Sequence, residues 1–543
     1  MYNIGMTKFF DKYEHRLNII IPIIAGVVFM ILSCINIQSS IWFDESYSAY
    51  LTRGSFSDIW KLTSIDVHPP LFYFALKIWS SIFGTDDFAM RFMSVFFGMI
   101  AIVFIFHLVR RWFGVRAASL STLLLSITPV FIRFGQEMRM YTMVFAIIAA
   151  ATLFLTLALD TTKLALKKDA DQKANKKLAR IYWIVYAVLV SVGMWTHYFT
   201  AFAWIAQLIF VFRYFGGLKT VWKERTIRKN LILTYVVAVA LYIPWIPGFF
   251  AQAMDVSGGF WIAPTSAKTI LDYICQIFVF MDSEYVNNYV AVLMIATIAI
   301  TIFLVIRFLK GATKQNKTRF ELLAWMILLP PVLMIFASLP PLTPLFNFRY
   351  TMYAMIFIWI MLGIVLAKFM TSHKASFKHV ITSLIMTAAV ITCSIIGIIN
   401  IETRDPKGYI KYALAPAFQI SHIDNEPIII NTDWNYYDAV FYDSEEHPIY
   451  FQENWSKYQW GSLEPIRTMK HHVVEDISEV IKDKDYFWYL YDTPEENTDD
   501  DEKNDITNEE ILKKFPKAFK GYHIINFVAD EHHIIFELER DSH

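Results

Sequence analysis

The stretch Ile41-Trp-Phe-Asp-Glu-Ser-Tyr47 follows a long apolar run, and it places two adjacent carboxylates, Asp44 and Glu45, at the mouth of a predicted membrane span. After a polar and mixed segment the chain continues Asp66-Val-His-Pro-Pro-Leu-Phe-Tyr-Phe74. Carboxylates are costly to hold beside hydrocarbon, and ionisable residues at that depth usually mark a functional site. An ordinary polar loop between two spans is the alternative interpretation, and the rest of the chain decides between the two.

The composition is that of a membrane protein. Of 543 residues, 56% are hydrophobic, 17% aromatic and 18% charged, whereas a soluble protein carries about a quarter charged residues. Lys+Arg and Asp+Glu number 49 each, so the net charge says nothing about a nucleic-acid partner, and none is expected. The cysteines Cys34, Cys275 and Cys393 form no CxxC pattern, and they predict neither a disulfide framework nor a zinc site.

Apolar runs near twenty residues match a hydrocarbon core of roughly 30 Å, which a helix crosses at about 1.5 Å per residue. The sequence therefore predicts a polytopic α-helical membrane protein of about eleven spans. The first run is too long for a signal-peptide core, and we interpret it as a retained span. The spans are expected at residues 17–37, 89–109, 117–134, 138–159, 181–196, 198–215, 230–250, 288–309, 321–339, 350–368 and 379–400.

Basic residues set the expected orientation. With the N-terminus in the cytoplasm, every loop predicted to be cytoplasmic is rich in Lys and Arg, while the external turns hold scattered cations. An error of one span would invert every later loop, so this agreement supports the span count. The part of the chain after the last span is then expected to be extracytoplasmic.

We therefore expect two domains: a transmembrane domain at 1–401, with an external loop at 38–88, and an extracytoplasmic α/β domain at 402–543. No site residue is predicted in the second domain, because aromatic residues in a small domain are more often core than sugar-stacking groups. Its expected strands are Pro427–Asn431, Asp485–Tyr491 and His533–Glu539, its helices are Val473–Lys482 and Asn508–Phe515, and a terminal hairpin runs from His523 to Glu539.

Polar residues from four separate segments are predicted at the same membrane face. Arginines that snorkel to headgroups and an interfacial aromatic belt would explain any one of them. Together they favour a site, because a carboxylate can take a proton from a hydroxyl while Arg and His bind a phosphate. They are Asp44, Glu45, Asp66 and His68 in the first external loop, Arg139 and Tyr141 at the fourth span, His197 and Tyr198 between the fifth and sixth, and Arg349 and Tyr350 at the tenth.

Two prolines, Pro69 and Pro70, prevent a helix before them and predict the start of a short one at Leu71. A helix over Leu71–Phe83 is too short to span a membrane, so we expect it to lie in the interface. Lys268–Phe280 is expected to form a second helix of this kind. Apolar surface beside a cationic pocket suits a lipid-linked phosphate.

Five motifs together resemble the GT-C glycosyltransferases, in the bacterial branch similar to protein O-mannosyltransferases and the aminoarabinose transferase. The resemblance covers the predicted spans and implies polyprenyl-phosphate sugar donors, action on the non-cytoplasmic side and inversion of the anomeric centre. It does not extend to an inserted β-trefoil-type domain, which this chain lacks. The motifs are the Asp44-Glu45 pair, H-P-P-L-F-Y-F from His68, Q-E-x-R-x-Y ending at Tyr141, T-H-Y around His197 and F-x-F-R-Y ending at Tyr350.

The resemblance also implies roles for the individual residues. Asp44 would be the catalytic base and Glu45 would position the acceptor. A divalent metal such as Mg or Mn, bound in some GT-C enzymes, would need Glu45, Asp66 and His68 as ligands, although their spacing fits no standard ligand pattern. His68, Arg139 and Arg349 would bind the donor phosphate, and Asp66, Tyr141, His197, Tyr198 and Tyr350 would shape the substrate pocket.

The expected function is therefore that of a hexosyltransferase-type enzyme in the cell membrane, which moves a sugar from a polyprenyl phosphate to a hydroxyl of an extracytoplasmic glycan, lipid or protein. The alternative is a polyprenyl-linked lipid flippase or transporter, which would place polar groups at the midplane of several spans. Here the ionisable groups gather at one face, and this favours catalysis. A receptor role for the C-terminal domain is a third interpretation, and it leaves the Asp44-Glu45 pair without a function.

Overall fold

The computed structural model divides into two compact units. The membrane unit comprises Met1–Ile37, Val67–Ala75 and Phe88–Asp405, and the second unit comprises Gln38–Asp66, Leu76–Asp87 and Pro406–His543. Each is described by itself. The structure describes residues 2–167, 171–371, 377–404, 410–414, 426–430, 432–443, 448–452, 464–469, 473–474, 476–492, 517–529 and 533–541.

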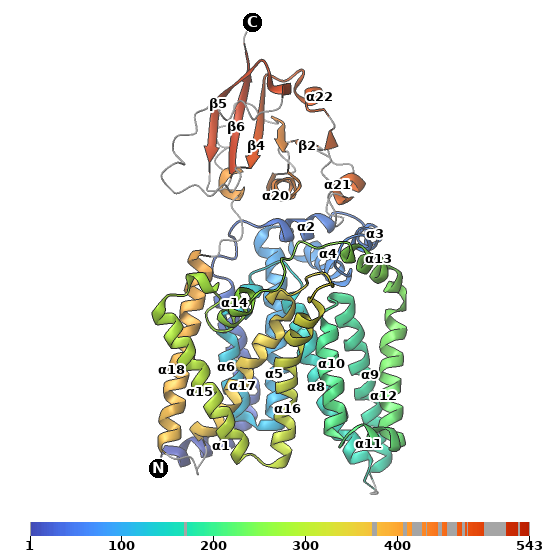
Figure 1. Cartoon of the computed structure of the whole chain (residues 1–543), viewed down its shortest axis with the longest axis vertical. Coiled ribbons are helices and arrows are strands. Elements are labelled where there is room, and N and C mark those ends of the chain that lie inside the picture. Colours follow the sequence, from blue (N-terminus) through green and yellow to red (C-terminus); the bar gives the residue numbers. More distant parts are fainter. Residues whose placement is uncertain are drawn as a thin grey trace. The chain divides into compact units, whose positions relative to one another are not determined.

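Long helices build the membrane unit (Figure 1). A backbone in hydrocarbon must satisfy its own hydrogen bonds, and long apolar runs therefore form helices. Among the described residues, 9 helices are long and apolar enough to cross a membrane, or 10 if the bent pair α6 and α7 forms one span. They are α1 (Tyr2–Ser33), α5 (Asp87–Phe113), α6 (Val115–Ser126) with α7 (Pro129–Gly135), α8 (Tyr141–Ala165), α9 (Gln172–Thr196), α12 (Arg225–Tyr242) with α13 (Ile246–Ser257), α15 (Asn288–Gly311), α16 (Lys314–Ala337), α17 (Met352–Thr371) and α18 (Phe377–Arg404).

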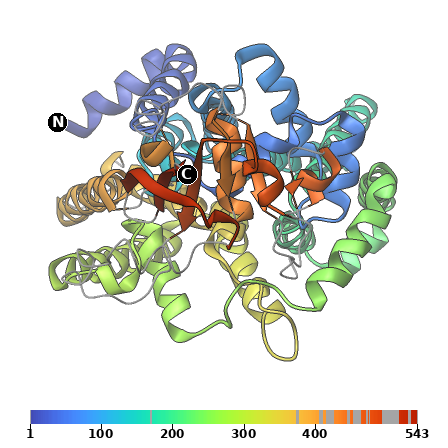
Figure 2. The same ribbon diagram turned by 90° about the horizontal axis from the view of Figure 1, so that it is seen from above.

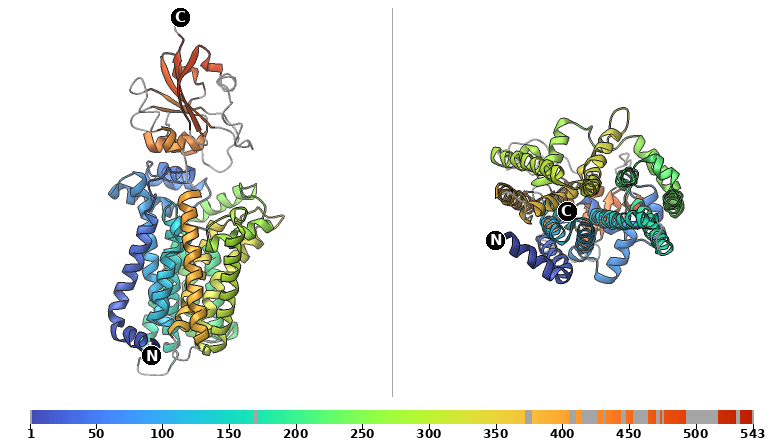
Figure 3. Two further views of the ribbon diagram at one scale, coloured as in Figure 1. Left: turned by 90° about the vertical axis from the view of Figure 1, so that its left-hand side faces the viewer. Right: turned by 90° about the horizontal axis from the view of Figure 1, so that it is seen from below.

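The polytopic helical architecture is thus as expected, and two details differ from a simple set of straight spans. The predicted sixth span is α10 (Thr200–Tyr214), whose 15 residues are fewer than the roughly 20 that cross a bilayer. The predicted third span is bent by 59° between α6 and α7, at Pro129. Proline lacks the amide proton that a continuous helix needs and clashes with the preceding turn. Figures 2 and 3 show the long helices nearly end-on and from the side.

Shorter helices occupy the connections. The helix expected after the two prolines is present as α4 (Leu71–Phe83), with the predicted ends, and the second expected helix is α14 (Ala267–Phe278). The 3-10 turn η1 (Ile243–Trp245) joins α12 to α13. The remaining short elements are α2 (Phe43–Leu51), α3 (Phe56–Ser64), α11 (Leu218–Lys223), η2 (Ser283–Tyr285) and η3 (Phe348–Thr351).

The second unit contains a six-stranded mixed sheet with the strand order β3-β2-β1-β4-β6-β5. The strands β3, β2, β1 and β4 run parallel, and β6 pairs antiparallel with both β4 and β5. The elements are β1 (Ile428–Ile430), α20 (Asp433–Asp443), β2 (Ile449–Gln452), α21 (Glu464–Met469), β3 (Val473–Val474), α22 (Ser478–Ile481), β4 (Tyr486–Asp492), η4 (Lys517–Phe519), β5 (Tyr522–Ala529) and β6 (His533–Arg540).

The sheet confirms the three predicted strands and the terminal hairpin. The predicted helix Val473–Lys482 is wrong in its first part, because Val473 and Val474 pair with β2 and the helix α22 begins at Ser478. β-branched valines favour a strand when a partner edge is present. The predicted helix Asn508–Phe515 lies outside the described residues. Tyr436 and Tyr437 are fully buried, as expected of core aromatic residues.

The helices α6 and α17 approach each other closely at Gly363. A Cβ atom at this position would lie 2.3 Å from the Cα of Ser121, and the Ser121 hydroxyl donates a hydrogen bond to the carbonyl of Ile360 at 2.9 Å. Small residues at such crossings allow two membrane helices to pack backbone to backbone. The pair anchors α17, the helix that follows η3.

We expect Gly363→Ala to destabilise the membrane unit by about 1–3 kcal/mol, because the added methyl group overlaps with the backbone of α6. Thermal unfolding of the detergent-solubilised protein measures the effect. Gly26→Ala is the matched control, because a Cβ there meets only Met99, at 3.8 Å. Equal unfolding midpoints for the two variants would contradict the close helix crossing.

Candidate active site

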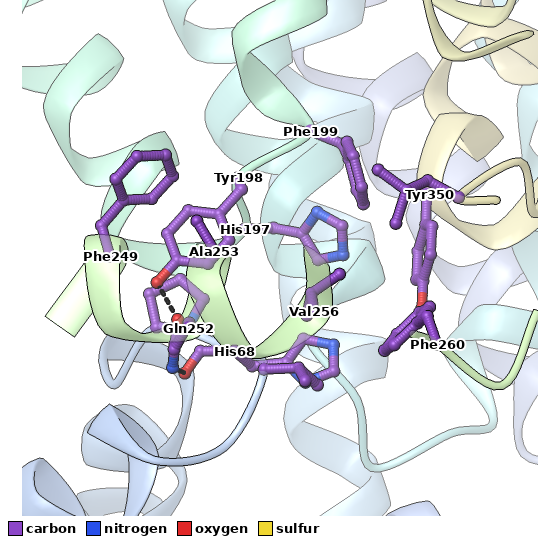
Figure 4. Close-up of a pocket in the computed structure, with 13 residues that line it drawn as sticks. His68, His197, Tyr198, Phe199, Phe249, Gln252, Ala253, Val256, Phe260 and Tyr350 are labelled. Carbon is purple, nitrogen blue, oxygen red and sulfur yellow. Dashed lines mark hydrogen bonds between the residues drawn. The ribbon is translucent and has the colours of Figure 1, made fainter. Parts of the chain in front are cut away.

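His197 is the meeting point of four segments that lie far apart in the sequence. It ends α9 and is only 4% exposed. Its ring centroid lies 5.8 Å from that of His68, 6.2 Å from that of Tyr141 and 5.3 Å from that of Tyr350. All four residues belong to the membrane unit, and Figure 4 shows three of these side chains around a common space.

Helix ends bring these residues together. Tyr141 is the first residue of α8, and Tyr350 lies in η3, directly before α17. His68 precedes the two prolines that start α4. In η3 the side chain of Asn347 accepts a hydrogen bond from the amide of Arg349 at 3.1 Å, which fixes this turn. The backbone at each helix end is freed from the helical repeat, so its side chains can point into a shared space.

An open, largely apolar pocket with about 700 Å³ of empty space adjoins His197. Phe249 and Val256 of α13 and Phe260 form apolar walls, and the rings of His68 and Tyr350 also face the pocket (Figure 4). Pockets of this kind bind ligands by apolar contact and use a few polar groups to orient them. The lining includes Tyr198 but not Tyr141.

A chain of hydrogen bonds fixes the segment that carries His68. The indole of Trp245 donates to the Tyr198 hydroxyl at 2.8 Å, and this hydroxyl donates to the side-chain oxygen of Gln252. The amide nitrogen of Gln252 then donates to the backbone carbonyl of His68 at 3.2 Å. Sequence reasoning missed Trp245 and Gln252. The available signal was an amide side chain in the otherwise apolar stretch Phe249–Met254.

Burial determines the charge state of His197. It lowers the pKa of His197 well below the usual value, and the nearby charges of His68 and Arg139 lower it further. His197 is therefore a neutral imidazole at pH 7, able to donate one hydrogen bond and accept another. Arg139, which is 3% exposed, keeps its positive charge, because a guanidinium does not lose its proton in proteins. The fixed positive charge in this neighbourhood is thus on Arg139.

Arg349 takes a different position from its neighbour Tyr350. Its guanidinium carbon lies 5.9 Å from the ring centroid of Trp261, in a cation–π arrangement, and its side chain is partly exposed. Arg349 is not among the residues that line the pocket, whereas Tyr350 is. Its predicted role at the donor phosphate stays a prediction.

The carboxylates Asp44, Glu45 and Asp66 belong to the second unit. Asp44 and Glu45 lie in the first turn of α2, where negative charge is favourable because the helix dipole is positive at this end. Glu45 and Asp66 are buried, and Asp44 is partly exposed. In the described part of the chain, no three His, Cys, Asp or Glu side chains group as ligands of a metal ion. The predicted Mg or Mn site at Glu45, Asp66 and His68 thus gains no support, and no step is assigned to a metal.

Comparisons with solved structures give the class of the fold. ArnT from Cupriavidus metallidurans, solved bound to undecaprenyl phosphate and in the apo state, aligns with a TM-score of 0.57 over 96% of this chain and 97% of that chain, at 11% identity. An Archaeoglobus fulgidus oligosaccharyltransferase covers 89% of this chain and 70% of its own at 15% identity and a TM-score of 0.48. The match to the Pmt1–Pmt2 complex of S. cerevisiae covers 44% of this chain and 34% of that chain, at 18% identity and a TM-score of 0.33. No curated protein matches the sequence.

The fold is therefore the one seen in ArnT, the GT-C fold that the sequence motifs predict. Independently of the fold, residues 67–247 match the sequence model of the dolichyl-phosphate-mannose-protein mannosyltransferase family. This segment includes His68, Arg139, Tyr141, His197 and Trp245. This segment is therefore similar to that family, and the chain as a whole shares the fold of ArnT.

Acidification is expected to destabilise the protein through His197. Because the pKa of His197 is lowered in the folded state, the unfolded state takes up an extra proton as the pH falls below about 6.5, the ordinary imidazole value. Protonation of His197 in the unfolded state then lowers the free energy of unfolding by up to about 1.4 kcal/mol per pH unit. Thermal unfolding between pH 7.5 and 5 measures the loss.

His197→Gln should remove that part of the pH dependence, while the same change at the exposed His15 should leave it intact. Identical pH dependence in the wild type and His197→Gln would contradict the neutral, buried state of His197.

Proposed function

We propose that the protein transfers one sugar from a polyprenyl phosphate to a hydroxyl group on the extracytoplasmic side of the membrane. The acceptor belongs to a cell-envelope glycan, a lipid or a protein. The observation that carries the proposal is the convergence of His68, Tyr141, His197 and Tyr350 beside the buried Arg139, at the edge of an apolar pocket.

The donor class follows from the chemistry of this convergence and from the relatives. A polyprenyl phosphate needs apolar surface for its chain and a cation for its phosphate. Phe249 and Phe260 line the apolar pocket, and Arg139 acts electrostatically on His197, which lines it too. The ArnT fold was solved with undecaprenyl phosphate bound, and the matching family is named for a dolichyl-phosphate sugar. A lipid-linked phosphate is the ligand these findings share.

The reaction would be a single displacement at the anomeric carbon. The acceptor oxygen forms a bond to that carbon, and its proton passes to the carboxylate of Asp44. The bond between the anomeric carbon and the phosphate oxygen breaks, and the phosphate keeps the electron pair. One displacement inverts the configuration, and polyprenyl phosphate is released with its negative charge balanced by Arg139.

The neighbours of Arg139 would orient the donor rather than balance its charge. Neutral His197 can donate a hydrogen bond to a sugar hydroxyl or phosphate oxygen without adding a second cation. The hydrogen bonds of Tyr198 and Gln252 hold the backbone of His68, so that its imidazole faces the pocket in a fixed position. Such preorganised groups contribute more than flexible ones, because no reorganisation is needed during reaction.

Asp44→Asn should insert and fold normally and bind the donor, yet lose transfer by about 10²-fold to 10⁴-fold, because the amide cannot accept the acceptor's proton. Transfer of radiolabelled sugar from a polyprenyl phosphate in membranes measures the loss. Asp86→Asn is the matched control, since this exposed aspartate lies in the same unit. Full transfer by Asp44→Asn would remove the assignment of the catalytic base.

Arg139→Gln should weaken transfer by about 10²-fold to 10³-fold, because it removes the charge that balances the departing phosphate. Arg213→Gln, which removes an exposed arginine paired with Glu321, should stay near the wild-type rate. Photo-crosslinking to a polyprenyl-phosphate analogue separates binding from chemistry. A rate for Arg139→Gln equal to that of Arg213→Gln would place the phosphate elsewhere.

A further inference from the structure

Within the second unit, helix α20 packs against α2, the helix whose first turn carries Asp44 and Glu45. The ring of Tyr437 lies 5.9 Å from that of Phe43, 5.6 Å from that of Tyr47 and 5.0 Å from that of Tyr50, measured between centroids. One turn of α20 therefore contacts the whole length of α2 through aromatic side chains.

Hydrogen bonds reinforce both ends of this packing. Before α2, the backbone amide of Ile41 donates to the Tyr442 hydroxyl at 2.8 Å. After α2, the guanidinium of Arg53 donates to the carbonyl of Val440 at 2.9 Å. Both bonds join segments almost 400 residues apart in the sequence, since their separations are 401 and 387 residues. The position of α2 in the second unit thus depends on α20.

A carboxyl group lies in the middle of this packing. Asp438 of α20 is 7% exposed, and its side chain is hydrogen-bonded to that of Ser46, while Glu45 beside it is fully buried. Two carboxyl groups are therefore enclosed between α2 and α20. Burying both as anions would be strongly unfavourable, because like charges in a poorly hydrated site repel each other.

The hydrogen bond that Ser46 makes to the backbone indicates which carboxyl group is neutral. Ser46 has one hydroxyl proton, which it donates to the carbonyl of Phe43 at 3.0 Å. The Ser46 oxygen is then an acceptor toward Asp438, and a carboxyl group donates only when it is protonated. The Oδ1 atom of Asp438 has no hydrogen-bond partner among the described residues, which is far less costly for a neutral carboxyl than for an anion.

The electrostatics agree with this geometry. Burial raises the pKa of Asp438 to about 8; a hydrogen bond that Ser46 could donate to the ionised carboxylate lowers the pKa, and the charge of Glu45 raises it. The strands β1 and β2, which α20 also contacts, contribute no charged side chain, and their titratable group is Tyr450. On α2, which carries Asp44 and Glu45, it is the charge of Glu45 that opposes ionisation of Asp438, while the guanidinium of Arg53 contacts α20 at the carbonyl of Val440.

We propose that Asp438 is a positioning residue for the Asp44-Glu45 turn, which it holds by donating its proton to Ser46. The catalytic consequence rests on the proposed function. In the protonated form, Asp438 keeps α20 against α2 and leaves Glu45 as the single buried anion. Loss of the proton places a second negative charge beside Glu45, and Ser46 must then give up its hydrogen bond to Phe43 in order to donate to the carboxylate. Both changes oppose the packing of α2.

The pH profile of transfer tests this role with two variants of the full-length protein. Asp438→Asn keeps a neutral donor toward Ser46, and Asp438→Leu keeps the approximate volume without a donor. Wild-type transfer should fall by up to tenfold per pH unit above about pH 8, whereas Asp438→Asn should stay within about twofold of the wild type at pH 7 and lose this fall. Asp438→Leu should be at least about tenfold slower at every pH.

A profile of Asp438→Asn that falls as the wild type does would overturn the proposal. So would full transfer by Asp438→Leu, since the donated hydrogen bond would then be dispensable. If Asp438→Asn and Asp438→Leu are equally impaired at pH 7, the carboxyl group acts in some way other than as a neutral donor, and the proposal also fails.

A measurement without any sugar donor separates this proposal from the proposed function. Because the pKa of Asp438 is raised in the folded state, its contribution to stability is lost as the pH rises from about 3.8 to about 8. The unfolding midpoint of the wild type should therefore fall relative to Asp438→Asn between pH 5 and 8.5. Parallel midpoints would refute the proton on Asp438, whereas this shift in a protein that transfers no sugar would refute only the proposed function.

Discussion

A helix in hydrocarbon uses its backbone hydrogen bonds internally, so the polar chemistry of a helical membrane protein concentrates where its helices end. The membrane unit follows this constraint. His197 ends α9, Tyr141 begins α8, Tyr350 precedes α17, and His68 precedes α4. Because these ends converge, the side chains meet in one place although more than 280 residues separate the first from the last. The long spans serve to bring these ends together.

This arrangement removes polar side chains from water, and the loss of hydration determines which of them are charged. His197 is kept neutral by burial, while Arg139 cannot be neutralised and retains its charge. The result is a fixed positive charge on Arg139 beside the neutral imidazole of His197. In the second unit burial acts on carboxyl groups instead, where it keeps Asp438 protonated beside Glu45.

Much of this organisation could be predicted from the sequence, for specific reasons. The two prolines before Leu71 define the start of α4, and the order of apolar runs and basic loops leads to the span pattern. Gln252 could not be predicted, because its partners His68 and Tyr198 lie 184 and 54 residues away. Val473 and Val474 were assigned to a helix, since a two-residue strand has no visible alternation. The burial of Asp438 could not be predicted, because it depends on packing against α2, almost 400 residues earlier in the chain.

The hydrogen bond from Gln252 to position 68 ends on a backbone carbonyl, not on the imidazole. The path of that segment is therefore independent of the side chain it carries. A substitution at position 68 therefore changes the side chain that faces the pocket, while the hydrogen bond from Gln252 to the backbone is kept. Position 68 thus combines a replaceable side chain with a backbone that Gln252 holds in place.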